Sequence, residues 1–390
     1  MIKKFSAFVG SNNASERSTD LEAYSYCSSE TTKKSSLVLW PQTLEQVRRI
    51  MLFANQTRTP ITIRGSGTNQ VNGSIGENTV VISSERMNKI LKIDEKNKVI
   101  EVEAGVRIAD LNRVLNEYKM VFPLIPLNPV TTIGGMIALN AVTKESHGLG
   151  RMEKWIESAE FVDGTGKQYL TRKKELVLGK EGLTGFITRA KLRITEQPVL
   201  SVDILSSEQL QELLKKVRNL QSDVEIYFME FFDKSLAEHF GFKNSYILFV
   251  AYTGLKGKNR TIPEVLALLR RADSVHSILR SKGYYFIQDA EVTLDKSYDL
   301  IDWCEKNNVA LCGHIGLGLF YAYFQKEDEG LVMSFRSFIR RINGKLGKIF
   351  GSGTVNSDFV SAEEKKELVK LKDEYDYNNI LNSGKIISYR

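Results

Sequence analysis

Three glycine-rich clusters in this chain could bind a ligand that carries phosphate. They are Arg64–Asn69 (RGSGTN), which follows an apolar run, Thr131–Asn140 and Gly179–Thr188. Glycines let consecutive backbone N–H groups point at one anion, which suits a pyrophosphate. Each cluster alone could be a plain turn or a tight helix–sheet contact, and the first is neither a Walker A loop nor a Rossmann fingerprint. Three clusters within about 120 residues indicate a shared ligand.

A second kind of chemistry, proton transfer, is suggested by one histidine. His314 stands in the segment Gly313–Tyr321 (GHIGLGLFY), at the end of an apolar run. An imidazole in such a place can act as a general base. Tyr321, Glu230 and Glu291 are weaker candidates for the same role. The alternative for His314 is a buried structural histidine.

Other titratable residues lie close to the glycine clusters. His147 precedes Gly148 and is a further candidate for a place near a bound ring system. Arg64, Arg151 and Lys385 could pair with a carboxylate or a phosphate. An ordinary structural or surface role is the alternative for each of them.

Short strands must position the first cluster. Apolar runs predict strands at 61–64 and 80–83, and a hairpin whose strands, 90–93 and 99–102, flank residues 94–97. Thr43 is expected to cap a helix whose buried stripe begins at Val47. The polar first 36 residues are expected to form a lead-in that packs loosely.

From residue 200 onward, longer strands and helices alternate. The pattern predicts an α+β layer: one antiparallel sheet with helices on one face. The predicted strands are 202–205, 225–232, 246–252, 284–287 and 309–312, and the predicted helices are 207–221, 261–282 and 295–307.

Composition narrows the class of protein. The 390 residues carry 54 Lys and Arg against 47 Asp and Glu, a formal charge of +7. Interleaved acidic residues make nucleic-acid binding a poor explanation of that charge. The basic runs 172–174, 270–271 and 340–341 are solvated faces or, alternatively, a patch for an acidic partner or an anionic membrane surface.

Cysteine and histidine usage adds two further limits. Three cysteines without a CxxC pair fit a reducing compartment, and four histidines are too few and scattered for a zinc module. The amino terminus does not resemble a signal peptide, and no apolar run is long enough to span a bilayer. We expect a cytoplasmic protein, with attachment to a membrane surface as a variant of that location.

The order and spacing of the clusters resemble the FAD-linked oxidases of the vanillyl-alcohol oxidase / p-cresol methylhydroxylase superfamily, in particular the glycolate oxidase D-subunit and D-lactate dehydrogenase group. The resemblance covers nearly the whole chain. The matching positions are Asp20, Tyr24, Pro41, the Arg64–Asn69 turn, Pro126, Thr132–Gly135, Asn140, Glu181–Thr188 and the tail Ile380–Lys385, where Ser383 replaces a proline.

This resemblance implies an α+β fold with a two-part p-cresol-methylhydroxylase-type FAD-binding domain in residues 1–198, of which 1–36 are the lead-in. Residues 199–350 would form a ferredoxin-like cap with an antiparallel sheet, and 351–390 would return to the FAD domain. The implied FAD contacts are Arg64, Gly65, Ser66, Gly67, Thr68, Asn69, Pro126, Thr131, Thr132, Gly134, Gly135, Asn140, Gly148, Glu181, Gly182, Gly185, Ile187 and Asn382. Some members attach the flavin through a histidine near the first turn, but none stands there, so we expect non-covalent FAD.

The metal motifs of the 2-hydroxy-acid members are degenerate in this chain. Those members carry GHxGDGNxH and a later GEHG. Here Leu317, Leu319 and Tyr321 replace the aspartate, the asparagine and the second histidine, and residues 351–354 read GSGT. One imidazole cannot hold a divalent metal, so we expect no metal site. The catalytic candidates are then His314, Tyr321 and Glu291.

The resemblance implies an FAD-dependent oxidoreductase that oxidises a small 2-hydroxy acid such as D-lactate or glycolate. Electrons would pass to an acceptor other than nicotinamide, such as an iron–sulfur partner or a quinone. One alternative is a metal-free flavin oxidoreductase of another alcohol or a sugar, for which Leu317, Leu319 and Phe320 would form an apolar wall. Another is a flavin-binding electron-transfer subunit with no substrate site of its own.

Overall fold

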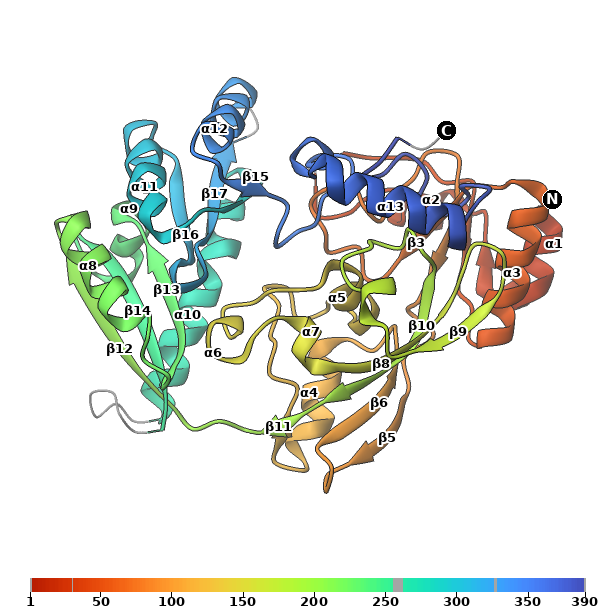
Figure 1. Cartoon of the computed structure of the whole chain (residues 1–390), viewed down its shortest axis with the longest axis horizontal. Coiled ribbons are helices and arrows are strands. Elements are labelled where there is room, and N and C mark those ends of the chain that lie inside the picture. The colour runs from red at the N-terminus through yellow and green to blue at the C-terminus, as the bar shows by residue number, and fades with distance from the viewer. Residues whose placement is uncertain (1, 30, 255–261, 326–327, 389–390) are drawn as a thin grey trace. The chain divides into compact units, whose positions relative to one another are not determined.

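The chain folds into two compact units. The computed structural model describes residues 2–29, 31–254, 262–325 and 328–388. Unit 1 comprises Met1–Ala141, Arg151–Gln197 and Phe350–Arg390, and unit 2 comprises Val142–Gly150 and Pro198–Ile349 (Figure 1). Residues 142–150, which the domain prediction placed with the FAD-binding domain, thus pack with unit 2. No helix in the described part of the chain is long and apolar enough to cross a membrane.

Unit 1 contains two main sheets and a strand pair. One sheet has the order β1-β2-β4-β3, the other β5-β6-β10-β8-β9, and β7 pairs with β11. The strands are β1 Ala14–Ser15, β2 Leu37–Leu39, β3 Ile61–Arg64, β4 Val80–Ser83, β5 Ile90–Asp94, β6 Val99–Glu103, β7 Met120–Val121, β8 Ile156–Val162, β9 Gln168–Thr171, β10 Phe186–Arg193 and β11 Thr195–Glu196. The helices are α1 Ile2–Val9, α2 Ser18–Ala23, α3 Leu44–Thr57, α4 Ile108–Asn116, α5 Ile133–Leu139, α7 Met152–Trp155 and α13 Ala362–Tyr375.

Local sequence signals account for much of unit 1. Thr43 caps α3 by accepting a hydrogen bond from the Gln46 N–H, as predicted, and the apolar stripe of that helix is buried. Strands β5 and β6 form the predicted antiparallel hairpin. The expectation of a loosely packed lead-in is wrong: Phe5 and Val9 on α1 are buried in the same core as α3.

Unit 2 is built on a seven-stranded sheet whose neighbouring strands are all antiparallel, in the order β12-β14-β13-β16-β17-β15-β18. Its strands are β12 Leu200–Ser207, β13 Ile226–Phe232, β14 Tyr246–Thr253, β15 Tyr284–Glu291, β16 Ala310–His314, β17 Leu319–Gln325 and β18 Lys345–Leu346. Its helices are α6 Ser146–Leu149, α8 Leu210–Leu220, α9 Lys234–Ala237, α10 Ile262–Ser281, α11 Ser297–Lys306 and α12 Glu329–Arg341. Residue 261, the predicted start of α10, lies outside the described residues. The α+β class with an antiparallel second sheet is confirmed.

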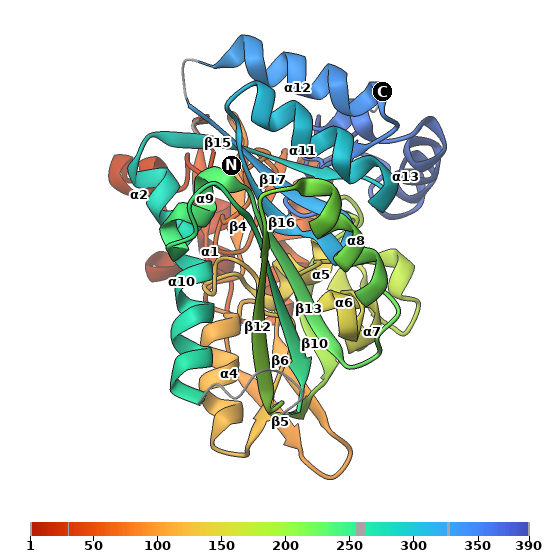
Figure 2. The ribbon, with the colours of Figure 1, turned by 90° about the vertical axis from the view of Figure 1, so that its left-hand side faces the viewer.

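The prediction of helices on one face of this sheet is wrong. Alternate residues of β17 point to opposite faces. On one face, the Tyr323 hydroxyl is 2.6 Å from Nδ1 of His276 on α10; on the other, Phe324 packs against Phe335 of α12. Figure 2 looks onto the side that carries α8 and α11. Buried residues on both faces explain why most of β13 and β17 is apolar.

Candidate functional site

The three glycine clusters meet in unit 1 and line one groove. Hydrogen bonds join the clusters: Ser66 Oγ donates to the Val130 carbonyl, 2.6 Å, and the Glu181 N–H donates to the Ala138 carbonyl, 2.9 Å. The three clusters therefore lie close together, as binding of one shared ligand requires.

Glycine is required in this groove for two physical reasons. Gly67 has a φ of +71°, and a Cβ there would overlap the Arg64 guanidinium. A Cβ on Gly65 would overlap Oγ1 of Thr132, the residue that caps α5. Side chains at these two positions would therefore distort the loop as well as fill the groove.

Arg64 supports the loop from beneath. Its guanidinium is buried, donates to the carbonyls of Tyr26 (2.7 Å) and Ser74 (3.3 Å), and lies over the Tyr24 ring at 5.0 Å. These contacts join the loop to the amino-terminal segment. Burial lowers the pKa of Arg64, and the neighbouring Tyr24 and Glu85 oppose that shift.

The carboxy-terminal segment holds two walls of the groove together. Asn382 accepts from the Ile63 N–H (3.0 Å) and donates to the Glu181 carbonyl (2.7 Å). The Glu181 carboxylate accepts the backbone N–H groups of Ser352 (2.6 Å) and Gly353 (2.9 Å). We call Ser352, Gly353, Asn382 and Lys385 the C-terminal clamp.

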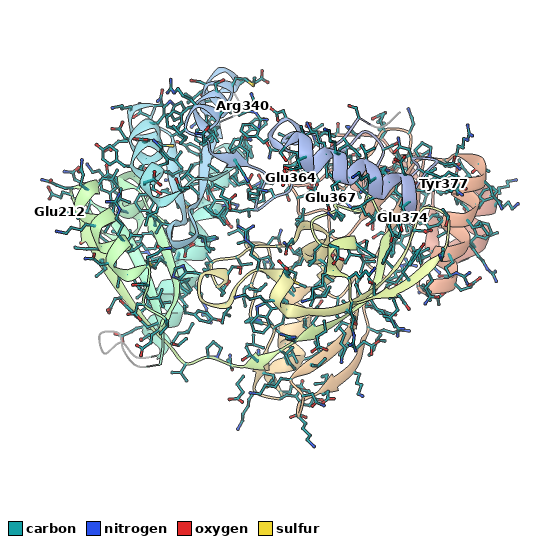
Figure 3. The ribbon with its side chains drawn as sticks, in the orientation of Figure 1. Glu212, Arg340, Glu364, Glu367, Glu374 and Tyr377 are labelled. Atoms are coloured by element: carbon teal, nitrogen blue, oxygen red, sulfur yellow. The ribbon has the colours of Figure 1, made fainter. Side chains whose placement is uncertain are left out.

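Helix α13 leads into this clamp and is itself anchored. Glu367, labelled in Figure 3, pairs with Lys180 beside the third glycine cluster at 2.9 Å. Tyr377, also labelled, accepts a hydrogen bond from the Asn55 side chain on α3 at 3.1 Å. The return of the chain to unit 1 is therefore fixed by one polar contact within the helix and one just after it.

Two buried charged groups lie within the clamp region. Burial raises the pKa of Glu181, against the pull of the Ser352 and Gly353 N–H groups. Burial lowers the pKa of Lys385 to about 7, and its Nζ donates to the Gly73 carbonyl at 2.7 Å. Lys385 thus fixes a groove loop through the backbone, a role its sequence position alone did not show.

Replacing Asn382 with alanine should weaken FAD binding about tenfold and destabilise unit 1 by about 1–3 kcal/mol, because the Ile63 N–H and the Glu181 carbonyl lose their partner in a buried place. FAD titration by fluorescence and urea unfolding measure the two effects. The control is Ser383→Ala, an exposed neighbour whose hydroxyl donates to the Asn379 carbonyl. Equal losses in both variants would contradict the clamp.

Fourteen of the eighteen predicted FAD contacts line the groove. The other four are Pro126, Asn140, Gly148 and Asn382. Asn140 ends α5 with a φ of +48°, and Asn382 acts through the backbone. Gly148 lies in unit 2, where a Cβ would stand 2.8 Å from the Ile226 carbonyl oxygen, so close packing accounts for that glycine.

The sequence prediction missed several lining residues, including Val71, Gly73, Ser74, Ala104, Ala138, Leu139, Val177 and Phe350. Most lack a distinctive local pattern. Gly73 was detectable in principle, because it follows the first cluster by a few residues in another glycine- and serine-rich stretch.

A buried acid–base cluster occupies unit 2 on the face of the sheet that packs against α10. His314 Nε2 and Tyr321 Oη share a hydrogen bond of 3.0 Å, and His314 Nδ1 lies 3.9 Å from Glu230 Oε1. Lys144 Nζ is 4.0 Å from Glu230 Oε2 and 2.6 Å from Asp273 Oδ1 on α10. Two catalytic candidates, His314 and Tyr321, are thus in contact, and Glu230 adjoins them.

The electrostatics of this cluster follow from burial. Desolvation lowers the pKa of His314 to about 3, with Lys144 adding to the shift. Desolvation raises the pKa of Glu230 to about 7; Lys144 opposes this, and Asp273 and Glu145 add to it. Although burial opposes its charge, the carboxylates around Lys144 raise its pKa above the usual value. Glu230 is therefore a group that titrates near neutral pH while His314 stays uncharged.

The remaining candidates lie elsewhere. Glu291 pairs in register with Leu319, which in turn faces His314, so Leu319 stands between the two candidates. Phe320 lies on the opposite face and packs against Phe231, so it cannot form one apolar wall with Leu319. Among the described residues, no group of three His, Cys, Asp or Glu side chains could hold a metal ion.

The structure also describes two other titratable candidates, His147 and Arg151. Burial lowers the pKa of His147 on α6, and a backbone hydrogen bond with Gly316 opposes that shift. Arg151 is half-buried at the start of α7. Neither lines the groove.

The groove fits a flavin dinucleotide by the chemistry of its lining. Backbone of Gly65, Gly67, Gly134, Gly135, Gly182 and Gly185 approaches the empty space, and Ser66, Thr68 and Thr131 add hydroxyl groups. Such a lining supplies hydrogen bonds to phosphates and sugars without a metal. The residues lining the groove in the described chain include no histidine, cysteine or tyrosine, so non-covalent FAD remains our prediction.

Comparison with known proteins bears on the cofactor. Residues 35–171 match the model of the FAD binding domain family. The chain is 29% identical over 210 residues to a D-lactate dehydrogenase of Archaeoglobus fulgidus, which covers 50% of this chain and 47% of that protein. It is 23% identical over 419 aligned positions to the glycolate oxidase subunit GlcD of Bacillus subtilis, covering 90% and 88%. The match to the archaeal enzyme thus spans about half of that relative's length.

A solved structure supports the fold. An alkyldihydroxyacetonephosphate synthase superposes with a TM-score of 0.75 at 17% identity, covering 98% of this chain and 84% of that one. The glycine-lined groove, the matched FAD binding domain and the related dehydrogenases agree on one cofactor. Residues 35–171 thus match an FAD binding domain, the chain is similar in sequence to a D-lactate dehydrogenase and a glycolate oxidase subunit, and its cofactor is FAD.

Proposed function

We propose that the protein is an FAD-dependent dehydrogenase of a small 2-hydroxy acid such as D-lactate or glycolate. When bound, FAD would supply an acceptor for the hydride released from C2 of the substrate. The observation that carries the proposal is the buried cluster of Glu230, His314 and Tyr321 in unit 2, which offers a place for the hydroxyl proton. The names of the related dehydrogenases and oxidases favour a hydroxy acid as the substrate class.

The electron acceptor is also a proposal. The related Bacillus protein is named a subunit, which favours a partner protein, such as an iron–sulfur subunit, over free nicotinamide. A quinone is the second acceptor class that we propose. Such an acceptor would place the protein in the cytoplasm or at the surface of a membrane.

An anaerobic substrate screen tests this function. D-lactate, glycolate and D-2-hydroxyglutarate are each mixed with the FAD-loaded protein, with L-lactate as the matched control. We expect one D-acid or glycolate to bleach the flavin absorbance within seconds to minutes, and L-lactate to leave it oxidised. Bleaching only by a sugar or a simple alcohol would favour the other oxidoreductase class. Bleaching by none of them would favour an electron-transfer subunit.

A further inference from the structure

Two buried polar atoms on neighbouring residues of unit 2 have no hydrogen-bond partner among the described residues. They are Nδ1 of His314 and Oε2 of Glu230, and the other Glu230 oxygen, Oε1, is the one that faces Nδ1. The exposed fractions of the two residues are only 7% and 9%. Buried polar groups nearly always have partners, because leaving one unpaired costs about 1–3 kcal/mol. Both residues therefore offer a hydrogen bond to an oxygen atom placed between them.

The distance between the two residues fits a single bridging oxygen. His314 Nδ1 and Glu230 Oε1 are 3.9 Å apart, too far for a direct hydrogen bond. An oxygen atom about 2.8 Å from each would close that triangle with normal hydrogen-bond lengths. A hydroxyl group can fill this place, since it accepts one hydrogen bond and donates another.

Tyr321 contacts one ring nitrogen of His314. Burial raises the pKa of the Tyr321 phenol well above its usual value, so the phenol keeps its proton and can donate to Nε2 at 3.0 Å. In the tautomer that accepts this hydrogen bond, the single proton of the neutral ring lies on Nδ1. In that state His314 is a donor toward the bridging oxygen, and Glu230 is the acceptor.

We propose that Glu230 is the catalytic base and that His314 Nδ1–H holds the substrate's hydroxyl oxygen. The assignment rests on the proposed function. In this assignment the substrate O–H bond would break as its proton passes to the Glu230 carboxylate, and the C2–H bond would break with FAD as the two-electron oxidant that takes up the hydride. The electrons left on oxygen form the C=O bond of a 2-oxo acid, so one proton and one hydride leave each substrate. Glu230 becomes neutral, and His314 and Tyr321 keep their protons throughout.

The charged groups around Glu230 are compatible with this role. Lys144 faces it from residues 142–150, where Glu145 also lies, and Asp273 faces it from α10. The other titratable groups close to Glu230 are Cys312 and His314 on β16 and Tyr321 and Tyr323 on β17. Lys144 acts as a positioning residue, because its ammonium favours the ionised carboxylate that a base must have.

The first test needs no turnover. The chain has only four histidines, so nitrogen-15 spectra of the FAD-loaded protein can resolve each ring, with His314→Gln to assign the signal. We expect His314 to be neutral and protonated on Nδ1 between about pH 5 and about pH 9. Its Nδ1 shift should move with a midpoint near the Glu230 pKa of about 7, and Glu230→Gln should abolish that movement.

The control is Asp233→Asn. Asp233 is a half-buried carboxylate directly after the same strand, but it accepts hydrogen bonds from the Leu236 and Leu311 N–H groups instead of facing His314. This variant should keep the pH-dependent movement of the His314 signal even though it destabilises the unit. A His314 ring protonated on Nε2, or charged at pH 6, would overturn the proposal, since His314 itself would then be the base or a cation.

The second test follows flavin reduction by the best acid of the screen. General-base catalysis contributes about 10²–10⁴-fold, so Glu230→Gln should slow anaerobic reduction by at least about 100-fold while FAD stays bound. The wild-type rate should rise with pH through about 7, and this rise should be absent in the variant. If the Glu230→Gln variant reduced the flavin at the wild-type rate and with the wild-type pH dependence, the assignment would be overturned. If no hydroxy acid reduces the wild type, the proposed function fails, and the nitrogen-15 result still decides the state of the Glu230–His314 pair.

Discussion

Replacing Asp376 with asparagine should destabilise unit 1 by about 3–5 kcal/mol, because it leaves the Lys372 ammonium buried without its counter-charge. Lys372 Nζ lies 2.5 Å from Asp376 Oδ2, and the two side chains are 1% and 0% exposed. The same carboxylate accepts the N–H groups of Ile380 (3.0 Å) and Leu381 (2.9 Å) at the start of the tail. Urea unfolding followed by circular dichroism measures the loss.

Asp373 provides the matched control for that variant. It is an exposed carboxylate on α13, two residues before the end of the helix. Asp373→Asn should change stability by less than about 0.5 kcal/mol. A loss below about 1 kcal/mol for Asp376→Asn, or equal losses for both variants, would contradict the role given to the buried pair.

Replacing Gly67 with alanine should weaken FAD binding at least tenfold. A left-handed backbone costs a residue with a Cβ about 1–2 kcal/mol, and here φ is +71°. The new Cβ would also displace the Arg64 guanidinium from the carbonyls of Tyr26 and Ser74. The dissociation constant is measured by quenching of FAD fluorescence.

Two glycine variants separate the causes. Gly73→Ala lies in the same groove, but its nearest neighbour would be 3.6 Å away and its φ is not in the left-handed region, so the loop should keep its shape. Gly10→Ala has a φ of +86° and open space, and it lies outside the groove, so it should cost stability without affecting FAD. Unchanged affinity in Gly67→Ala would contradict the account of the loop.

Local sequence signals predicted the elements that depend on local chemistry. The β5–β6 hairpin, the Thr43 cap and the glycine turn at Gly67 each have a short-range cause: a turn, a side-chain acceptor and a left-handed backbone. The superfamily motifs added the order of the glycine clusters along the chain. Together these signals were sufficient to place fourteen residues of the groove.

Long-range packing explains what the sequence did not predict. Residues 142–150 leave unit 1 for unit 2, and Lys144 thereby reaches Glu230 and Asp273. No local pattern marks that excursion. The choice between Glu230 and Glu291 depends on strand register, because both lie on apolar strands and only the pairing brings one of them to His314.

The lead-in shows the same limitation. Its polar composition suggested loose packing, yet two apolar side chains at helical spacing, Phe5 and Val9, are enough to bury α1 against α3. Composition averaged over 36 residues concealed that pair. The C-terminal clamp was only partly visible, since the role of Lys385 depends on a carbonyl more than 300 positions away in sequence.

The central claim, an FAD-dependent oxidation of a 2-hydroxy acid, is tested most directly by a single-turnover measurement. The FAD-loaded protein is mixed without oxygen with the acid that the screen selects, and flavin absorbance and the 2-oxo acid product are quantified together. We expect one 2-oxo acid to form for each FAD reduced. A protein that takes up no FAD, or a flavin that stays oxidised with every hydroxy acid, would contradict it.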